Sequence, residues 1–424
     1  MSNEGFIQAA PKGNRLHIAI FGRRNVGKSS LLNTLTRQKT SIVSDTAGTT
    51  TDPVEKPMEF LPLGPVLFID TAGIDDTGEL GTLRVEKSRQ VLDRTDIAIL
   101  VLDVTRDRGG WSAWEEELLA EFDRRQTPLV IARTKSDLAE GAPCADYPPE
   151  LAERKIPMVE LTSPPDGKTS GVTELRDALV RLVPDDFLTP PPMVADLLPP
   201  GELAILVTPI DKEAPKGRLI LPEVQAIRDL LDHRQMALVV QTGELADALR
   251  RVKAALVITD SQAFAQVSAI VPESIPLTSF SILLARQKGD FTVLLAGAKT
   301  IGKLGANAKI LIAEACTHHP IAEDIGTVKI PRLLKKRLGE SITIGHAQGH
   351  DFPDDAHLAE WDLVIHCGGC VWNRREMLRR ISRCVSSAVP VTNYGLAIAS
   401  LTGILDRAAA PVLNSGGDGR NAER

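Results

Sequence analysis

The chain has 424 residues, a formal net charge of −6 and a pI near 5.8. This length suffices for about two to four domains. The acidic balance argues against a large nucleic-acid-binding face, and aromatic side chains, at 4% of the residues, are too scarce to indicate base-stacking platforms. No apolar run reaches the length of a membrane span, and the N-terminus has no apolar signal-peptide core. We therefore expect a cytoplasmic protein that binds neither nucleic acid nor membrane.

The first 185 residues alternate short apolar runs with amphipathic stretches. The apolar runs are typical of buried strands, and the stretches between them are typical of helices. This alternation predicts an α/β fold with a mostly parallel sheet that is covered by helices on both faces. The expected strands cover residues 16–22, 65–70, 97–103, 128–134 and 158–162.

A phosphate-binding motif follows the first of these strands. Residues 22–30, GRRNVGKSS, satisfy G-x-x-x-x-G-K-[ST] and open a helical stretch. The backbone N–H groups of such a loop, with the helix N-terminus, bind phosphates. We expect Lys28 to reach the β- and γ-phosphates and the Ser29 hydroxyl to bind Mg²⁺. The other nucleotide-binding residues expected in this loop are Gly22, Asn25, Val26, Gly27 and Ser30.

Two further segments complete the predicted phosphate and magnesium site. In DTAG, Asp70 ends a strand, where it can hold Mg²⁺ through water, and the Gly73 N–H can sense the γ-phosphate. The hydroxyl-rich loop 44–52, SDTAGTTTD, has the composition of a switch that supplies a Mg²⁺-binding threonine when the γ-phosphate is present.

Base recognition is expected at the ends of the last two strands of this region. In TKSD, which begins Thr134-Lys135, the Asp137 carboxylate can accept two hydrogen bonds from the guanine N1–H and N2–H₂ edge, which adenine does not offer. In LTS, a backbone N–H at Ser163 could meet guanine O6. Ligands of α/β sheets bind at the carboxyl ends of strands, so the ordered series predicts a GTP site.

These motifs resemble the TrmE–Era-like branch of translation-factor-type GTPases, through GRRNVGKSSLLNTL, AGTTTD and DTAG. The resemblance implies that Asn25 helps to hold K⁺ beside the phosphates and that Thr50 binds Mg²⁺. It also implies that Ile74 replaces a water-positioning glutamine, so that GTP hydrolysis is slow and K⁺-stimulated. Lys28, Thr50, Asp70 and Gly73 are then the catalytic residues. The guanine motif of this group usually begins with Asn, whereas this chain has Thr134.

A proline-rich stretch divides the chain. Residues 183–202 contain six prolines, which cannot continue a helix or occupy a central strand. The block that follows is short enough to be marginal on its own, so it is expected to need a partner. No internal repeat is evident. We expect a GTPase domain at 1–185, a linker at 186–201, a small α/β domain at 202–270, a second α/β domain at 271–412 and a disordered tail at 413–424.

Two clusters of cysteine and histidine follow apolar strand candidates in the last block. AEACTHHP contains Cys316 and His318, and VIHCGGC contains His366, Cys367 and Cys370. If the two strands are parallel neighbours, both clusters emerge at the same edge of a sheet and can converge. After the second cluster, the sequence N-x-x-E predicts a capped helix, whose N-terminus favours thiolates.

The residues alone leave three kinds of site open. Three Cys and one His fit a tetrahedral Cys₃His zinc site. A strand, a CxxC and a helix are also typical of a redox dithiol, which predicts a reversible Cys367–Cys370 disulfide. Three thiolates can also hold an iron–sulfur cluster whose fourth iron is bound by something other than Cys. Cys384, inside the predicted helix, is expected to be a packed small hydrophobe.

The pattern C-x-H…H-C-x-x-C resembles that of the HydF-type GTPases that mature [FeFe]-hydrogenase, and text such as LVTPIDKEAPKGRLILPE and HCGGCVWNRREM is similar as well. The likeness covers nearly the whole chain. It implies a homodimer and a C-terminal [4Fe–4S] cluster on Cys316, Cys367 and Cys370, with His318 or His366 as a possible exchangeable ligand. It further implies a diiron precursor that is received from two radical-SAM maturases and delivered to apo-[FeFe]-hydrogenase.

The alternative is an Era-like GTPase that acts on the ribosome or tRNA and carries a structural Cys₃His zinc module. It predicts a basic RNA-facing domain. The acidic pI, the scarce aromatics and the lack of a KH-type G-x-x-G context argue against it.

Overall fold

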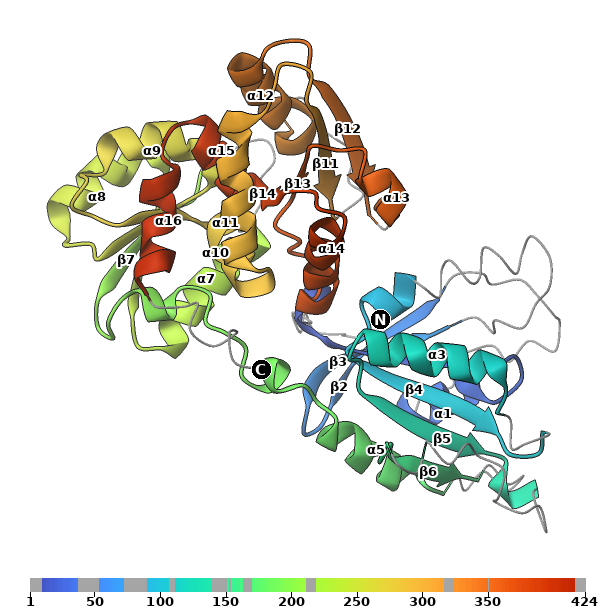
Figure 1. Ribbon diagram of the computed structural model, residues 1–424. Coiled ribbons are helices and arrows are strands. Elements are labelled where there is room, and N and C mark those ends of the chain that lie inside the picture. Colours follow the sequence, from blue (N-terminus) through green and yellow to red (C-terminus); the bar gives the residue numbers. More distant parts are fainter. Residues whose placement is uncertain are drawn as a thin grey trace, which may run out of the picture. The chain divides into compact units, whose positions relative to one another are not determined.

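The computed structural model describes residues 10–36, 53–71, 90–106, 111–138, 151, 154–162, 170–210, 219–315, 324–349 and 351–415. The chain forms two compact units, Met1–Pro190 and Pro191–Arg424, coloured blue to green and green to red in Figure 1. Their boundary falls inside the proline-rich stretch. Among the described residues no helix combines the length and apolar character needed to cross a membrane.

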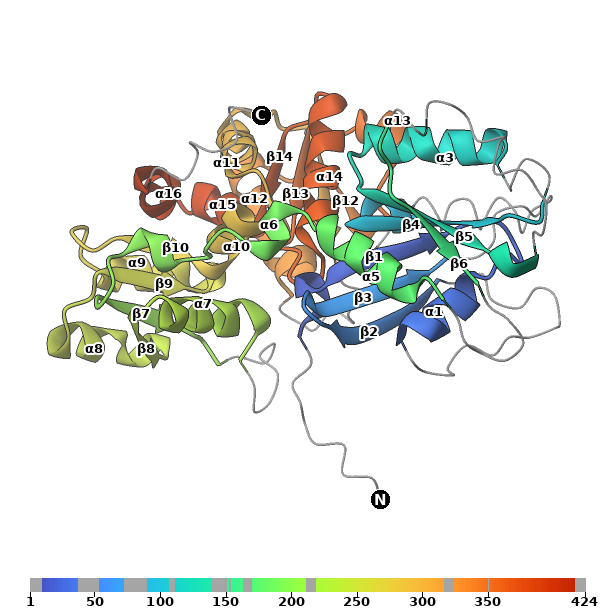
Figure 2. The same ribbon diagram turned by 90° about the horizontal axis from the view of Figure 1, so that it is seen from below.

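The N-terminal unit is built on a six-stranded sheet of order β2-β3-β1-β4-β5-β6 (Figure 2). Every neighbouring pair is parallel except β2 and β3. The central strands β1 and β4 are buried along their whole length, as expected for strands covered on both faces. The strands are β1 (Leu16–Phe21), β2 (Val54–Phe60), β3 (Gly64–Asp70), β4 (Ile97–Asp103), β5 (Leu129–Thr134) and β6 (Met158–Leu161).

Helices cover both faces of this sheet. Successive side chains of β1 point to opposite faces, so Ile18 and Ile20 enter one apolar core while Ala19 and Phe21 enter another. The first core is closed by α1 and α5 and the second by α3. The described helices are α1 (Lys28–Thr36), α3 (Ala113–Arg124), α5 (Val172–Arg181) and α6 (Asp185–Leu188).

The predicted parallel α/β fold and its five strands are confirmed in this unit, with ends that differ by a residue or so. The antiparallel strand β2 was not predicted. Its sequence, VEKPMEF, carries a proline and is largely exposed or half-buried, because β2 lies at the edge of the sheet. An edge strand needs no continuous apolar run, and the chain therefore gives little sign of it.

The C-terminal unit contains two four-stranded parallel sheets (Figure 1). Their orders are β10-β9-β7-β8 and β12-β11-β13-β14. Within each sheet the strands stand in the same order, second, first, third and fourth. The strands are β7 (Leu203–Val207), β8 (Met236–Val240), β9 (Leu256–Thr259), β10 (Leu277–Ser279), β11 (Lys309–Glu314), β12 (Thr343–Gln348), β13 (Leu363–His366) and β14 (Val391–Asn393).

The two sheets of this unit share one continuous apolar core, which contains Ile205 of the first sheet and Ile312 of the second. The helices that pack with them lie between successive strands, except the final two, which follow the last strand, β14. They are α7 (Leu221–Asp232), α8 (Leu245–Arg251), α9 (Phe264–Ile270), α10 (Phe280–Lys288), α11 (Phe291–Thr300), α12 (Ile330–Leu338), α13 (Asp355–Leu358), α14 (Arg374–Ser386), α15 (Tyr394–Leu401) and α16 (Leu405–Asn414).

The two sheets also end in the same way, which the sequence did not reveal as a repeat. In each, the last strand leads directly into a helix whose N-cap side chain, Ser279 or Asn393, accepts a hydrogen bond from a backbone N–H of the first turn. The two helices meet near these ends, where Asn393 Nδ2 donates to Ser281 Oγ over 3.0 Å. The likeness is one of topology and capping, and only a few positions of the sequence carry it.

Three of the expected boundaries need correction. The sheet that begins at β7 continues to β10, beyond residue 270, because this buried three-residue strand is too short to show a pattern. Inside the predicted linker, Met193 and Val194 are buried in an apolar core, so this segment packs against the C-terminal unit. The last helix reaches Asn414, inside the predicted tail, while residues 416–424 lie outside the described part of the chain.

A second stretch that fits the phosphate-loop pattern, GAKTIGKL at 297–304, has Leu304 in place of the magnesium-binding hydroxyl and spans the end of α11 and the short 3₁₀ helix Ile301–Lys303. Gly297 lies inside α11. A Cβ atom at this position would stand 2.0 Å from the Val391 carbonyl oxygen, so the glycine allows α11 to pack closely on β14.

Candidate nucleotide and metal sites

The phosphate-binding loop joins β1 to α1 at the carboxyl edge of the six-stranded sheet of the N-terminal unit. Gly27 has a φ of +99°, and Gly22 has a φ of +151° with its Cα so close to β4 that a Cβ would stand 2.7 Å from the Val101 carbonyl oxygen. Both positions therefore require glycine. Lys28 is buried, and its Nζ donates to the carbonyls of Gly22 (2.8 Å) and Arg23 (2.7 Å), so the ammonium lies over the loop.

The two described magnesium candidates lie in contact. Ser29 Oγ donates a 2.7 Å hydrogen bond to Asp70 Oδ2. Burial raises the pKa of Asp70, although the Ser29 hydrogen bond and the charge of Lys28 oppose that rise. The other carboxylate oxygen, Oδ1, is buried and has no hydrogen-bond partner among the described residues. The Ser29 hydroxyl and the Asp70 carboxylate, whose Oδ1 has no hydrogen-bond partner among the described residues, are oxygen ligands of the kind that Mg²⁺ prefers.

Thr134 ties the base-recognition segment to the phosphate loop. Its Oγ1 donates to the Val26 carbonyl over 2.7 Å and also contacts the Leu102 carbonyl at 3.1 Å. The side chain is buried. The threonine that departs from the usual asparagine thus holds the end of β5 against the loop through a direct hydrogen bond.

Lys135 makes a second connection to the same loop. Its Nζ donates to Asp103 Oδ2 at 2.5 Å and to the Asn25 carbonyl at 3.3 Å. Although burial works to raise the pKa of Asp103, hydrogen bonds from Lys135 and Thr105 hold that pKa below its usual value. Asn25 and Lys135 both have a positive φ, 62° and 61°, so the two turns that meet here have the same unusual backbone conformation.

Asp137 lies half-buried in a short 3₁₀ turn, Ser136–Leu138, directly after β5. Ser136 Oγ donates to the Leu161 carbonyl at the end of β6. The segment TKSD is thereby fixed on one side to the phosphate loop and on the other to the strand that precedes LTS. Thr50, Gly73 and Ser163, three of the predicted site residues, lie outside the described residues.

The strands that precede the two cysteine clusters, β11 and β13, are parallel neighbours, which meets the condition for the clusters to converge. The backbone N–H of Cys367 donates to the Ala313 carbonyl over 2.8 Å. In return, the backbone N–H of Ala315 donates to Cys367 Sγ over 3.1 Å. Ala315, the residue that precedes Cys316, is therefore hydrogen-bonded through its N–H to the sulfur of Cys367. Cys316 and His318 themselves lie outside the described residues.

The CGGC loop is closely packed between two helices. Gly369 has a φ of +60°, and a Cβ there would stand 2.4 Å from Met377 Sδ of α14. A Cβ at Gly368 would stand 3.0 Å from Leu284 Cδ1 of α10. After the loop, the Asn373 side chain accepts a hydrogen bond from the Glu376 N–H and caps α14, as predicted. Cys367 and Cys370 thus lie on the loop that leads into the N-terminus of α14.

A buried lysine, which the sequence analysis missed, contacts this loop. Lys288, the last residue of α10, is 4% exposed. Its Nζ donates to the carbonyls of Gly369 (3.2 Å), Cys370 (3.0 Å) and Trp372 (2.7 Å). Burial lowers the pKa of Lys288 to about 8, while the nearby Cys370 and Cys367 act to raise it. The only sequence sign of its role is a lysine that ends an apolar helix.

His366 is buried with both ring nitrogens engaged. Its Nδ1 lies 2.8 Å from the Cys367 carbonyl oxygen, and its Nε2 lies 3.4 Å from Arg380 Nη1. Burial and the charge of Arg380 lower the pKa of His366 to about 3, so the imidazole is neutral. A neutral ring that donates from Nδ1 accepts at Nε2. This arrangement supports the backbone at Cys367 and does not favour His366 as an exchangeable metal ligand.

The described residues alone do not complete a metal site. Among them, no group of three or more His, Cys, Asp and Glu side chains is placed to hold an ion. Two thiols on one loop at a helix N-terminus, with a backbone N–H already directed at one sulfur, nevertheless fit the chemistry of a thiolate-bound cluster. A third thiolate would have to come from the segment that follows Ala315.

Comparison with protein families assigns three segments of the chain. Residues 17–135 match a GTPase model, the 50S ribosome-binding GTPase. Residues 193–289 match the hydrogen maturase F dimerization domain, and residues 292–411 match the hydrogen maturase F tetramerization domain. The two maturase models together cover more than half of the chain. The chain belongs to the hydrogen maturase F family.

The curated relatives resemble this family member through its GTPase domain. The tRNA modification GTPase MnmE of a Synechococcus species is 38% identical over 187 residues, which are 42% of this chain and 37% of that protein. The GTPase Der of a Nitratiruptor species is 36% identical over 141 residues, 32% of this chain and 29% of that protein. The chain therefore spans less than two fifths of the length of either relative.

Among solved structures, Era of Aquifex aeolicus bound to GDP and AlF₄⁻ is 21% identical, with 55% of this chain and 97% of that chain covered and a TM-score of 0.33. The G domain of the FeoB iron transporter of T. maritima is 24% identical, with 40% and 98% covered and a TM-score of 0.29. The assignment of the family therefore rests on the family models. The family model that matches residues 292–411 is named as a tetramerization domain, and the sequence patterns did not predict a tetramer.

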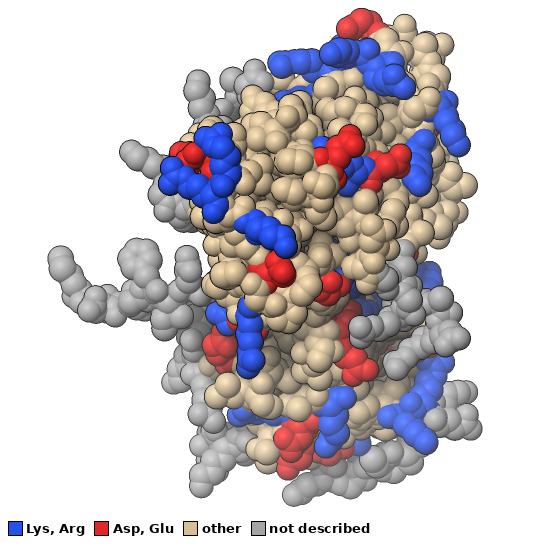
Figure 3. Space-filling view, turned by 90° about the vertical axis from the view of Figure 1, so that its left-hand side faces the viewer, with Lys and Arg blue, Asp and Glu red and all other residues tan. Residues whose placement is uncertain are grey.

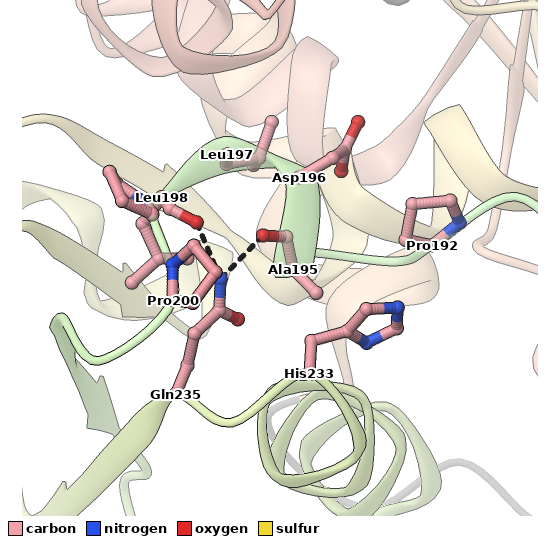
Figure 4. Close-up of a pocket in the computed structure, with 9 residues that line it drawn as sticks. Pro192, Ala195, Asp196, Leu197, Leu198, Pro200, His233 and Gln235 are labelled. Carbon is pink, nitrogen blue, oxygen red and sulfur yellow. Dashed lines mark hydrogen bonds between the residues drawn. The ribbon is translucent and has the colours of Figure 1, made fainter.

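A separate pocket of about 500 Å³ lies against the proline-rich segment at the start of the C-terminal unit (Figure 4). Gln235 Nε2 reaches into this segment and donates to the carbonyls of Ala195 and Leu198. The pocket is lined by Pro192, Ala195, Asp196, Leu197, Leu198, Pro199, Pro200, His233 and Gln235. Its lining holds no predicted site residue, and its walls show how the predicted linker is anchored on the unit that follows.

Proposed function

We propose that this protein is a GTP-hydrolysing scaffold or carrier in the maturation of [FeFe]-hydrogenase. It binds a [4Fe–4S] cluster through Cys316, Cys367 and Cys370. It assembles a diiron subcluster, or receives it from two radical-SAM maturases, and delivers it to apo-[FeFe]-hydrogenase. The observation that carries this proposal is the combination of a GTPase domain with two maturase-specific segments, the second of which contains the CGGC loop.

The nucleotide site supports the GTPase part of the proposal. The loop N–H groups and Lys28 bind the phosphates, Ser29 and Asp70 hold Mg²⁺, and Asp137 reads the guanine edge. The contact between Ser29 and Asp70 supports the magnesium assignment, because the two oxygens are 2.7 Å apart. Thr50 and Gly73 would respond to the γ-phosphate, and Asn25 would help to hold K⁺. GTP then acts as a switch and takes no part in the metal chemistry.

The carboxyl edge of the sheet β12-β11-β13-β14 supports the iron–sulfur part of the proposal. A cluster bound by three thiolates would supply one iron with an exchangeable position. The chain's own residues prepare the thiolates: the Ala315 N–H is bonded to Cys367 Sγ, and the N-terminus of α14 follows Cys370. Both features favour negative charge on sulfur. His318 stays the candidate for the exchangeable ligand, since the nitrogens of His366 are engaged within the fold.

An exposed apolar edge supports a homodimer. Strand β8 lies at the edge of its sheet, and Met236 and Val239 on it are 53% and 40% exposed. On the adjacent helix α7, Val224 and Leu231 are 45% and 59% exposed. Such an edge invites pairing with another chain. We propose a second copy of this chain as the occupant, because the edge belongs to the segment that matches a dimerization domain.

The cluster is tested by anaerobic purification and reconstitution with iron and sulfide. We expect visible charge-transfer absorption in the wild type, its loss in the Cys316→Ala/Cys367→Ala/Cys370→Ala variant, and its retention in the control Cys384→Ala. A colourless protein that holds one zinc ion per chain would overturn the cluster assignment. Delivery is tested separately, by adding the loaded protein to apo-[FeFe]-hydrogenase and measuring hydrogen evolution.

One observation favours a second function, a GTPase that acts on RNA with a structural Cys₃His zinc module. A relative named as a tRNA modification GTPase shares 38% identity with this chain, but over 42% of its length only. On the face shown in Figure 3 the basic side chains stand in small separate groups, some beside acidic ones, and not in one continuous stripe. Salt-dependent binding of tRNA or ribosomal RNA by the purified protein would favour this second function.

A further inference from the structure

The end of α10 and the CGGC loop with the start of α14 are far apart in the sequence, but each donates side-chain hydrogen bonds to backbone carbonyls of the other. From α10, Lys288 Nζ donates to the carbonyls of Gly369, Cys370 and Trp372 at 2.7–3.2 Å. From the start of α14, Arg374 Nη1 donates to the carbonyls of Gln287 (2.8 Å) and Gly289 (3.2 Å). Lys288 thus binds carbonyls that lie just before Arg374 in the chain, and Arg374 binds the carbonyls on either side of Lys288. We call this pair of contacts the Lys288–Arg374 clasp.

We propose that Lys288 is the positioning residue of the cluster site: it fixes the Cys367–Cys370 loop in its binding conformation and supplies the cation that sets the reduction potential of the bound cluster. Arg374 in turn holds the end of α10 that carries Lys288. This inference rests on the proposed function, in which the two cysteines ligate an iron–sulfur cluster.

The hydrogen bonds support the positioning role. A buried carbonyl that loses its donor costs free energy, and here one side chain serves three carbonyls within four residues. The loop needs such support, because its two glycines lower the cost of alternative backbone conformations in the unbound state. Outer residues that orient metal ligands typically change metal affinity by roughly 10- to 100-fold when they are removed.

The charge supports the electrostatic role. A cluster on three thiolates is anionic, and reduction adds another negative charge. A cation that is 4% exposed is poorly screened by water, so it stabilises the reduced state more than the oxidised one. Arg380, the other buried cation near the loop, is already directed at His366 and at the Gly349 carbonyl, to which it donates over 2.6 Å. Lys288 is the cation whose ammonium contacts the loop backbone itself.

The clasp also joins two family-defined segments. Lys288 belongs to the segment that matches the dimerization domain, at 193–289, and the loop belongs to the segment that matches the tetramerization domain, at 292–411. In addition, Leu284, one turn before Lys288, would stand 3.0 Å from a Cβ at Gly368. The geometry of the cysteine loop is therefore set by a helix from outside its own sheet.

The test replaces Lys288 with Met, which keeps the length and apolar stem of the side chain and removes the ammonium. In the apoprotein we expect faster amide hydrogen exchange across residues 367–373. After reconstitution we expect a reduction potential that is more negative than that of the wild type, and iron loss to a chelator that is roughly 10- to 100-fold faster. Lys299→Met, at an exposed site on α11, is the matched control and should leave all three values unchanged.

Arg374→Met provides a second variant if Lys288→Met fails to fold. It removes the other half of the clasp, and we expect faster exchange in the same loop with a smaller shift in potential, because Lys288 remains. A wild-type protein that takes up no iron–sulfur cluster would refute the proposed function. A wild type that takes up the cluster, beside a folded Lys288→Met with unchanged exchange, potential and iron retention, would refute this inference alone.

Discussion

The Thr134 hydroxyl donates a 2.7 Å hydrogen bond to the carbonyl of Val26, more than a hundred residues earlier in the chain. This contact places the base-recognition segment directly on the phosphate loop. The threonine that departs from the expected motif therefore has a direct contact with this loop.

We expect Thr134→Val to weaken both stability and nucleotide binding. The substitution keeps the shape and removes the donor, which leaves the buried Val26 carbonyl without this partner and lowers the free energy of unfolding by about 1–3 kcal/mol. Denaturant unfolding and the affinity for a fluorescent GTP analogue are the measurements. Thr173→Val, at an exposed position on α5, should change neither. Equal values for Thr134→Val and the wild type would show that the contact is unimportant.

Ser29→Ala should abolish most of the magnesium dependence of nucleotide binding. The hydroxyl in contact with Asp70 would be lost, and with it one ligand of the ion. We expect roughly tenfold weaker GTP binding with Mg²⁺ present, equivalent to about 1.4 kcal/mol, and little change with EDTA. Calorimetric titration with and without Mg²⁺ measures both. Thr34→Ala, on the same helix, is the control, and an identical loss in EDTA would argue against a magnesium role.

Asp137→Asn should change the choice of base. A carboxylate accepts from N1–H and N2–H₂ of guanine, whereas an amide nitrogen donates and suits the 2-oxo group of xanthine. Two hydrogen bonds of this kind typically discriminate by about 1–3 kcal/mol. Competition between GTP and xanthosine triphosphate should therefore reverse in the variant. If ATP competes equally with GTP in the wild type, the guanine assignment itself is wrong.

The cysteines should differ sharply in reactivity. Burial raises the pKa of Cys384 to about 12, and the side chain is fully buried in α14, whereas Cys367 and Cys370 are half-buried. The thiolate is the reactive form. In the reduced native apoprotein at pH 8, iodoacetamide should label Cys367 and Cys370 and spare Cys384. Raising the pH from 7 to 9 should not make Cys384 react, because a pKa of about 12 leaves its thiol protonated over this range.

Peptide mass spectrometry measures the labelling, and denatured protein is the control, because an exposed cysteine has a pKa near 8.5. Labelling of Cys384 at the rate of Cys367 in the native protein would contradict the burial of this helix face.

Met236→Lys should weaken the proposed homodimer. The substitution places a charge on the exposed edge strand β8, where it opposes pairing with a second chain. Light scattering coupled to size-exclusion chromatography measures the mass over a range of concentrations. Val385→Lys is the matched control, because Val385 is also 53% exposed but lies on α14. An unchanged mass for Met236→Lys would place the contact between copies elsewhere.

Elements that depend on a local pattern of residues could be predicted from the sequence. The buried strands of the first unit, the phosphate loop with Lys28 and Ser29, and the capped helix after CGGC all follow from short stretches of chain. Such features are readable because burial on both faces demands continuous apolar runs, and because phosphate binding demands glycine at fixed positions. The sequence left open whether the strands before the two cysteine clusters are neighbours, and the sheet shows that β11 and β13 pair in parallel.

The distant residues that contact these elements became known from the folded structure alone. Edge strand β2 and the three-residue strand β10 carry no pattern of their own, since pairing with a neighbour defines them. Lys288 is an ordinary lysine in the sequence, and its role depends on a loop that begins almost eighty residues later. Hydrogen bonds to backbone carbonyls leave no mark on the residues that accept them, because every residue has a carbonyl group. The contact between Lys288 and the cysteine loop therefore becomes visible only when the chain is folded.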